Sequence, residues 1–153
     1  MDADFSHDPK DLPRLLKACR GDGYDFSIGS RYVKGGKVTN WSWDRIILSY
    51  GASWYVRLLT WMWIKDPTAG FICYSDKVLS AIDFKKIEFV GYAFQIEMKF
   101  AAHQLGFKYK EVPITFKDRE EGVSKMNGGI ISEAVIGVIK MRWRALFGYY
   151  RKG

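Results

Sequence analysis

A long segment from Trp41 to Ile64 restricts the possible folds more than any other part of this chain. The part from residue 46 to residue 64 is mostly apolar and has the length of a membrane span. Arg57 lies near its middle, where insertion of an arginine costs roughly 2.5–3.5 kcal/mol. We therefore expect a helix that packs on a folded domain or lies in a membrane interface, and not a helix that crosses the bilayer.

The same segment is rich in tryptophan, a residue that prefers sites where one end of the side chain is dry and the other is wet. A net charge of +7 indicates that the partners of the chain are anionic. Together these features favour an anionic membrane surface over nucleic acid, for which no recognition motif is present. The expected membrane anchors are Trp41, Trp43, Trp54, Trp61 and Trp63, and ordinary core packing of these side chains is the alternative.

A second helix is predicted over residues 130–150, where an apolar face is mixed with Lys140, Arg142 and Arg144. This pattern is typical of a basic amphipathic helix at a membrane surface. A core-packing terminal helix, whose cations complement its own dipole, is the alternative. The two candidate membrane-interface helices are therefore residues 41–64 and 130–150, within a single domain that covers residues 1–153.

The rest of the chain alternates helical and strand patterns, which predicts an α/β domain. Pro113 lacks the amide hydrogen that an interior strand needs, so its strand should have a free edge or lack a full set of ladder hydrogen bonds there. Cys19 and Cys73 have neither a zinc-site spacing nor a disulfide framework. The expected elements are helices over 8–20, 75–82 and 91–106 and strands over 25–32, 71–74 and 107–116.

Two acidic residues at the start of the chain, Asp2 and Asp4, are two positions apart. On an extended strand this spacing places both carboxylates on the same face. A divalent cation relieves their repulsion, and hard oxygen ligands suit Mg²⁺ or Mn²⁺. A solvated turn is the alternative on the spacing alone. For His7 we expect a solvated or capping role in preference to metal ligation.

Several segments occur in a fixed order, and the set is more specific than any one member. They are Asp2-Ala3-Asp4-Phe5-Ser6-His7-Asp8-Pro9, Gly29-Ser30-Arg31-Tyr32-Val33-Lys34-Gly35-Gly36, Trp41-x-x-x-Arg45-x-x-x-Ser49, Asp66-x-Thr68-x-Gly70-Phe71, Gly91-Tyr92-x-Phe94-Gln95-x-Glu97-Met98, and Glu111-Val112-Pro113-Ile114-x-Phe116-x-Asp118-Arg119-x-x-Gly122-x-Ser124-Lys125. This ordered set resembles the polyprenol (dolichyl) phosphate mannosyltransferases, within the family 2 inverting glycosyltransferases. The resemblance covers nearly the whole chain.

The resemblance implies the C-terminal portion of a glycosyltransferase A fold, the fold of nucleotide-diphospho-sugar transferases, with a mixed sheet and flanking and interfacial helices. It also implies an enzyme that transfers mannose from GDP-mannose to the phosphate of a polyprenol, with inversion and with Mg²⁺ or Mn²⁺. The implied partners are a nucleotide-sugar donor, a polyprenyl phosphate and an anionic membrane surface. The implied location is the cytoplasm, peripheral at the membrane face.

The resemblance assigns roles by position. Asp2 and Asp4 correspond to metal ligands, with Ser6 standing where the family often has glutamine. Arg31, Arg45 and Ser49 correspond to the group that holds the acceptor phosphate. Arg119, with Ser124 and Lys125 in its loop, corresponds to the group that binds the donor phosphates, and Arg119 and Arg45 are the expected catalytic residues.

Chemistry agrees with these assignments. The planar guanidinium of arginine donates two hydrogen bonds to one phosphate. Arg45 and Ser49 are four residues apart, so on a helix they share a face. A phosphate acceptor is already an anion and needs no general base. Relatives that glycosylate hydroxyl groups carry an aspartate just before the helix that starts near Gly91, and its absence here favours a phosphate acceptor.

The family fold begins with a nucleotide-binding half ahead of the acidic pair, and nothing in this sequence resembles it. We therefore expect little transferase activity from this chain alone. Two alternatives stay open at this stage. One is a polyprenyl-phosphate glycosyltransferase that uses another sugar, and the other is a non-enzymatic, basic peripheral membrane module.

Overall fold

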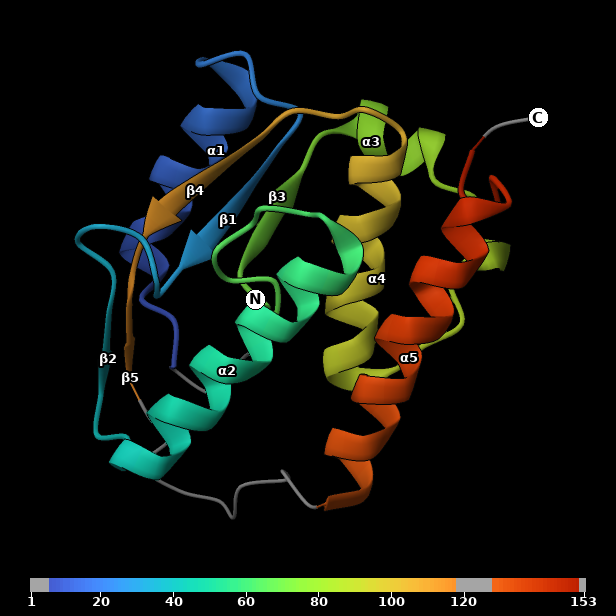
Figure 1. The fold of residues 1–153 in the computed structure, drawn as a ribbon. Coiled ribbons are helices and arrows are strands. Elements are labelled where there is room, and N and C mark those ends of the chain that lie inside the picture. Colours follow the sequence, from blue (N-terminus) through green and yellow to red (C-terminus); the bar gives the residue numbers. More distant parts are fainter. Residues whose placement is uncertain (1–5, 118–127, 152–153) are drawn as a thin grey trace.

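The structure, a computed structural model, describes residues 6–117 and 128–151. Its centre is a three-stranded sheet in the order β3-β1-β4, with β1 (Phe26–Ser30) in the middle (Figure 1). β3 (Ile72–Tyr74) pairs with β1 in antiparallel and β4 (Tyr109–Pro113) in parallel orientation. The sheet is therefore mixed, as the resemblance implies, and Pro113 lies on an edge strand, as its missing amide hydrogen predicts.

Strand β1 is buried along its whole length because both faces of the sheet are covered. On one face, the Ser27 hydroxyl donates a hydrogen bond of 2.9 Å to the carbonyl of Leu15 in α1 (Leu12–Arg20). On the other face, Phe26 and Ile28 enter the main core. Because both faces are covered, β1 lacks the alternation of buried and exposed residues that is seen in a strand with one face in solvent.

Helix α1 follows a 3-10 turn, η1 (Pro9–Asp11), whose backbone is capped by the side chain of Asp8. The helix and its cap were expected from the sequence and are confirmed. The buried face of α1 is narrow, because Leu12 and Leu16 are exposed. Leu15 and the small Ala18 are the buried residues, since α1 approaches the sheet closely along that line.

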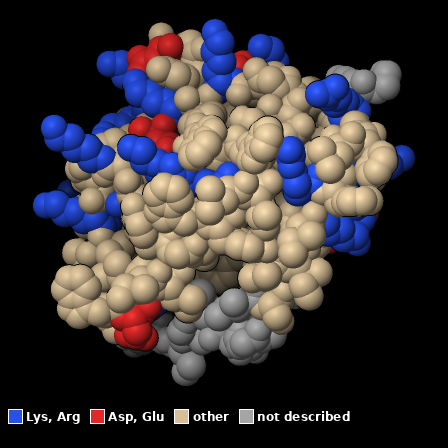
Figure 2. All heavy atoms as spheres, in the orientation of Figure 1, with Lys and Arg blue, Asp and Glu red and all other residues tan. Residues whose placement is uncertain are grey.

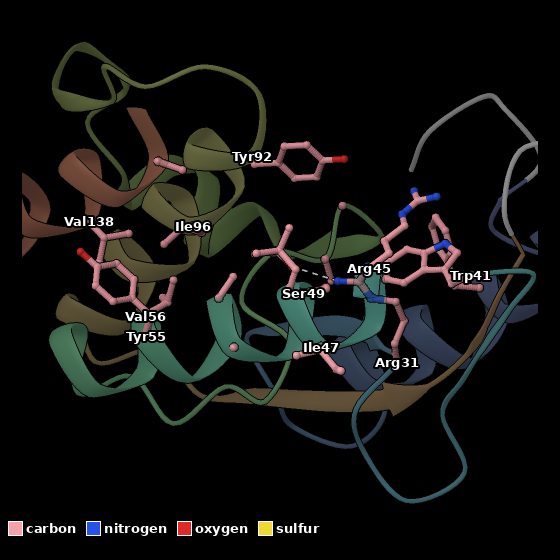
Figure 3. Close-up of a pocket in the computed structure, with 18 of the residues that line it drawn as sticks. Arg31, Trp41, Arg45, Ile47, Ser49, Tyr55, Val56, Tyr92, Ile96 and Val138 are labelled. Atoms are coloured by element: carbon pink, nitrogen blue, oxygen red, sulfur yellow. Dashed lines mark hydrogen bonds between the residues drawn. The ribbon is translucent and has the colours of Figure 1, made fainter. Parts of the chain in front are cut away.

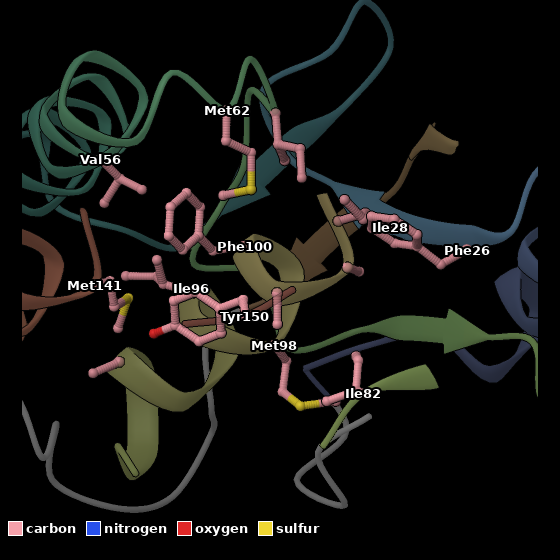
Figure 4. Close-up of a cluster of buried hydrophobic side chains, with 14 of the residues drawn as sticks. Phe26, Ile28, Val56, Met62, Ile82, Ile96, Met98, Phe100, Met141 and Tyr150 are labelled. Atoms are coloured by element: carbon pink, nitrogen blue, oxygen red, sulfur yellow. The ribbon is translucent and has the colours of Figure 1, made fainter. Parts of the chain in front are cut away.

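The opposite face of the sheet is covered by α2 (Trp43–Thr60), α4 (Gly91–Gln104) and α5 (Gly128–Leu146) (Figure 1). Their buried side chains form one core with the sheet, shown in Figure 4. α5 ends at Leu146, earlier than predicted, and the chain then turns so that the Tyr150 hydroxyl donates to the buried Glu97 carboxylate at 2.9 Å. Glu97 thus supports the fold and no chemistry needs to be assigned to it.

Smaller elements complete the chain. Two short strands, β2 (Lys37–Thr39) and β5 (Thr115–Lys117), form a parallel pair that sequence patterns did not predict. A Cβ atom at Gly36, just before β2, would lie 2.6 Å from the carbonyl oxygens of Ser30 and Arg31, so the return of the chain requires glycine. The helix α3 (Asp76–Ala81) and the 3-10 turn η2 (Phe84–Lys86) lead to α4.

Candidate functional site

A cavity of about 460 Å³ lies between α2, α4, α5 and the ends of β1 and β4. Its two ends differ in chemistry (Figure 3). Arg31, Arg45 and Trp41 lie at one end, whereas the other end is lined by side chains without charge. The uncharged lining includes Tyr55, Val56, Ile96, Val135 and Val138. The cavity therefore suits a ligand with an anionic head and an apolar body.

Arg31 follows β1 and is fixed by a buried carboxylate. Its Nε and Nη2 donate to the two oxygens of Asp66 at 2.7 and 2.6 Å, and Nη2 also donates to the Thr68 hydroxyl at 2.9 Å. Burial lowers the pKa of Arg31, but the hydrogen bonds and the charge of Asp66 outweigh burial and raise it. The guanidinium is thus charged, rigid and held in the cavity wall.

Arg45 and Ser49 lie one turn apart on α2, and both line the cavity, as their four-residue spacing predicts. The guanidinium of Arg45 stacks 4.3 Å from the ring centroid of Trp41, and that of Arg31 lies 5.3 Å from the same ring. The Ser49 hydroxyl accepts a hydrogen bond of 2.6 Å from Tyr32. One indole therefore brings together the two arginines that the sequence assigned to one anion.

Trp41 has a different place from the one expected. The sequence predicts a membrane anchor, but Trp41 is partly buried under the two arginines and against Phe116. Its Nε1 is buried and has no acceptor among the described residues. A buried N–H group beside two guanidinium groups is a ready donor for an anion in the cavity.

The loop 66–70, which carries Asp66, is held from behind by Lys99 of α4. The ammonium of Lys99 is buried and donates to the carbonyls of Pro67, Ala69 and Gln95 at 2.9, 2.7 and 2.9 Å. Burial lowers the pKa of Lys99 to about 7, against the opposing charge of Asp66. Lys99 therefore holds the loop that carries Asp66. Asp66 in turn fixes the position of Arg31.

Replacing Lys99 by methionine gives a pH-dependent prediction. An unfolded lysine has a pKa of about 10.4, so above pH 7 the unfolded chain binds more protons at this position than the folded chain. Below pH 7 the buried Lys99 is charged, and the free-energy cost of burying its ammonium is fully present. As pH rises through 7 the folded chain loses this proton, and the cost falls. The unfolding free energy of the unchanged chain should therefore rise by about 1–2 kcal/mol between about pH 7 and 8.5, relative to Lys99→Met. Urea unfolding at several pH values measures this, and parallel profiles would contradict it.

The remaining predicted site residues divide into two groups. Asp2, Asp4, Arg119, Ser124 and Lys125 lie outside the described residues, so their roles stay predictions. Ser6 is buried, and its carbonyl accepts a hydrogen bond from the Lys117 amide of β5 at 3.1 Å. Within the described ranges, no group of three His, Cys, Asp or Glu side chains is arranged to hold a metal ion.

The expectation of a solvated or capping His7 is wrong. His7 is buried and lines the cavity, with its ring 4.9 Å from that of Phe71 and 5.2 Å from that of Phe116. Its backbone forms a bridge with Phe116, which draws the residue against β5. The segment that leads from the acidic pair thus enters the described fold beside the cavity.

Two exposed apolar stripes run along α2 and α5, which pack against each other (Figure 1). The members within each helix recur at three- and four-residue spacing, so they form one helix face. Trp61 and Trp63 follow the end of α2 and extend its stripe. Figure 2 shows this side of the molecule covered mostly by uncharged side chains, with Lys and Arg gathered toward its margins. We call it the aromatic face, and it comprises Trp43, Ile47, Tyr50, Trp54, Leu58, Trp61, Trp63, Ile136, Ile139, Trp143, Leu146 and Phe147.

The aromatic face includes four of the five predicted anchors, and Trp43 is 81% exposed. Arg142 of α5 stacks 4.8 Å from the ring of Trp61, which joins the two stripes. No helix in the described part of the chain combines the length and the hydropathy that a bilayer crossing requires. The helix expected within residues 41–64 is present as α2, Trp43–Thr60.

Comparison of the sequence with known proteins shows similarity to one family of enzymes. The model of "Glycosyl transferase family 2" matches residues 1–84. An undecaprenyl-phosphate mannosyltransferase of Micrococcus luteus is 47% identical over 150 residues, which cover 95% of this chain and 61% of that protein. A polyprenol monophosphomannose synthase of Mycolicibacterium smegmatis is 50% identical over 138 residues, which cover 90% of this chain and 52% of that protein.

A more distant relative shows the same relation. A dolichol-phosphate mannosyltransferase of Pyrococcus furiosus is 38% identical over 146 residues, which cover 94% of this chain and 40% of that protein. The chain spans about half the length of the curated relatives it matches. The similarity thus extends over nearly all of this chain but only part of each relative.

Proposed function

Because the chain belongs to glycosyl transferase family 2, we propose that it supplies the acceptor site of an enzyme that transfers mannose from GDP-mannose to a polyprenyl phosphate. One observation carries the proposal. A single cavity has two guanidinium groups at one end and an uncharged lining at the other. A phosphate attached to an isoprenoid chain matches this arrangement, because it has an anionic head and an apolar tail.

The acceptor phosphate would bind at the cationic end. Arg45 supplies a fork of donors and Ser49 a hydroxyl on the same helix face, while Arg31 adds a second positive charge. Both arginines contact the ring of Trp41, whose buried Nε1 offers one more donor. Arg31 is held in place by Asp66, and Arg45 brings a second guanidinium to the same end of the cavity.

The isoprenoid chain would occupy the apolar end, between α2, α4 and α5. Val56, Ile96 and Val138 from these three helices line that end (Figure 3). Burying each methylene of the chain there contributes about 0.8 kcal/mol. Affinity should therefore depend on both the head and the tail of the acceptor.

The donor would meet the acceptor at the polar end. Ser6 is buried and His7 lines the cavity, so the segment after Asp2 and Asp4 lies beside the acceptor site. Two carboxylates and a hydroxyl are hard oxygen donors that fit Mg²⁺ or Mn²⁺. When bound, the cation would neutralise negative charge on the leaving diphosphate. Arg119, Ser124 and Lys125 would bind the same diphosphate.

The reaction requires positioning more than proton transfer. An oxygen of the acceptor phosphate attacks C1 of the mannosyl group as the bond from C1 to the donor diphosphate breaks. The nucleoside diphosphate leaves with the electron pair, and the configuration at C1 inverts. Arg45 and Ser49 hold the attacking phosphate, which is already ionised, so the chain needs no general base there.

The aromatic face would lie on an anionic membrane. Its exposed tryptophans suit the interfacial region of a bilayer, and the surrounding lysines and arginines attract anionic lipids. The cavity is lined by α2 and α5, the helices that carry this face. A polyprenyl phosphate could therefore enter the site from the membrane without leaving it completely.

Binding of a short acceptor tests the proposal. Purified chain should bind farnesyl phosphate at least about tenfold more tightly than farnesol, because a charge-assisted hydrogen bond contributes roughly 1.5–3 kcal/mol. It should also bind farnesyl phosphate more tightly than inorganic phosphate, which lacks the tail. Titration calorimetry measures all three ligands. Equal affinity for farnesol and farnesyl phosphate would overturn the proposal.

A further inference from the structure

A second, smaller cavity of about 260 Å³ lies on a different face of α2 from the first. It is lined by Tyr32, Tyr50, Ser53, Trp54, Arg57 and Lys65. The four lining residues from α2 recur at three- and four-residue spacing, so they share one helix face. The residues of α2 that line the first cavity, such as Arg45 and Ser49, occupy another face.

Arg57 is the unusual member of this cavity. Its guanidinium lies 4.4 Å from the ring centroid of Trp54 and 5.4 Å from that of Trp63. Its Nε is buried and has no hydrogen-bond acceptor among the described residues. Leaving a buried donor unsatisfied costs free energy, so such a group indicates a missing acceptor.

The nearby carboxylate of Glu111 does not fill this role. Its two oxygens accept hydrogen bonds from the backbone amides of Lys65 and Asp66 at 2.9 and 3.1 Å. Within residues 6–117 and 128–151, no carboxylate forms an ion pair with Arg57. In the described part of the chain, the guanidinium of Arg57 therefore contacts two indole faces and no carboxylate.

Further donors surround the same space. Lys65 contributes an ammonium, and Tyr50 contributes a hydroxyl on the exposed side. Tyr32 already donates to Ser49, and Ser53 already donates to the Ser49 carbonyl. A planar guanidinium, an ammonium and a hydroxyl around one space are the donor set of a phosphate site.

We propose that Arg57, Lys65 and Tyr50 bind the phosphodiester of a phospholipid headgroup. Tyr50 and Trp54 belong to both this cavity and the aromatic face, so the cavity opens toward the surface that we place on the membrane. This part rests on the proposed membrane contact, but not on the acceptor site. Because α2 separates the two cavities, the lipid phosphate bound here is not the phosphate that receives the sugar.

Vesicles that differ in a single headgroup test the proposal. The carrier lipid is digalactosyl diacylglycerol, which has no phosphate, with either phosphatidylglycerol or a diacylglycerol hemisuccinate added at equal surface charge. We expect about tenfold tighter binding to the phosphatidylglycerol vesicles. Arg57→Gln should abolish that preference, and it should lower binding to the hemisuccinate vesicles only as much as loss of any one cation of this face does. Lys65→Gln should reduce the preference.

Arg142→Gln is the matched control, because Arg142 is a cation of the same face outside the cavity. It should lower binding to both vesicles equally. Unchanged affinity of Arg57→Gln for farnesyl phosphate shows that the variant is folded and separates this result from the acceptor site. Equal binding of the unchanged chain to both vesicles overturns the proposal. So does tight, Arg57-dependent binding of soluble glycerol 3-phosphate without a vesicle preference, because the ligand would then be a free phosphate.

Discussion

Replacing Asp66 by asparagine should lower the free energy of unfolding by about 3–5 kcal/mol, which is the usual cost of removing one partner of a buried ion pair. The Asp66 side chain is fully buried and that of Arg31 is 9% exposed, so the remaining guanidinium would lose its counter-charge in a site with little water. Asp66 also accepts a hydrogen bond of 2.9 Å from the Arg31 amide, which asparagine can replace only in part. Denaturant unfolding measures the loss.

A matched substitution and a double variant make the experiment specific. Asp76→Asn removes an exposed carboxylate from the first turn of α3 and should change stability by no more than about 0.5 kcal/mol. Asp66→Leu combined with Arg31→Met removes both charges and should recover part of the loss, because no unpaired charge stays buried. A double variant less stable than Asp66→Asn would show that the pair does not act as we describe.

The importance of Asp66 could not be predicted from local sequence. Asp66-Pro67-Thr68-Ala69-Gly70 is typical of a turn, and the turn is present. Its carboxylate is buried because Arg31, 35 residues earlier, arrives beside it when β1 and β3 pair. Lys99 is hidden in the same way, since a lysine in a helix is normally exposed. Both residues act through contacts that exist only in the folded chain.

The elements with strong local signals were predicted well. Asp8 and Pro9 mark the start of the first helix, and Gly106 follows the end of α4 with the positive φ that glycine tolerates. The strand predicted over 107–116 includes the first two residues of β5, but β2 and the pairing of β2 with β5 were missed. That pairing joins segments about 78 residues apart and has no local pattern. Motif order, and not periodicity, singled out Arg31 and Arg45, and the structure places both in the wall of one cavity.

The tryptophans predicted to be membrane anchors illustrate a mixed outcome. Tryptophan content alone did not distinguish Trp41 from the other predicted anchors, although Trp41 lies under the arginines and Trp43 is exposed. The distinction depends on the start of α2, because residue 41 precedes the helix and points into the cavity wall. A shift of two residues along the chain thus separates a residue of the site from a residue of the surface.

Replacing Arg45 by glutamine should weaken binding of farnesyl phosphate by about 10- to 100-fold, since it removes a charge-assisted contact to the phosphate. Binding of farnesol, which lacks the phosphate, should change little. Arg45→Lys keeps the charge but loses the planar fork, so its affinity should lie between those of the glutamine variant and the unchanged chain. Ser49→Ala should have a smaller effect, because it removes a neutral donor.

The comparison of ligands separates a role in binding from a role in folding. A variant that merely loosens α2 would lose affinity for farnesol and farnesyl phosphate together, because both use the apolar end of the cavity. Arg14 lies on the exposed side of α1, away from the cavity. Arg14→Gln is therefore the matched control for a lost arginine and should leave both affinities unchanged. If Arg45→Gln binds farnesyl phosphate as well as the unchanged chain does, the cationic end of the cavity is not the phosphate site. Arg31 alone could not then carry the proposal, because Asp66 already balances its charge.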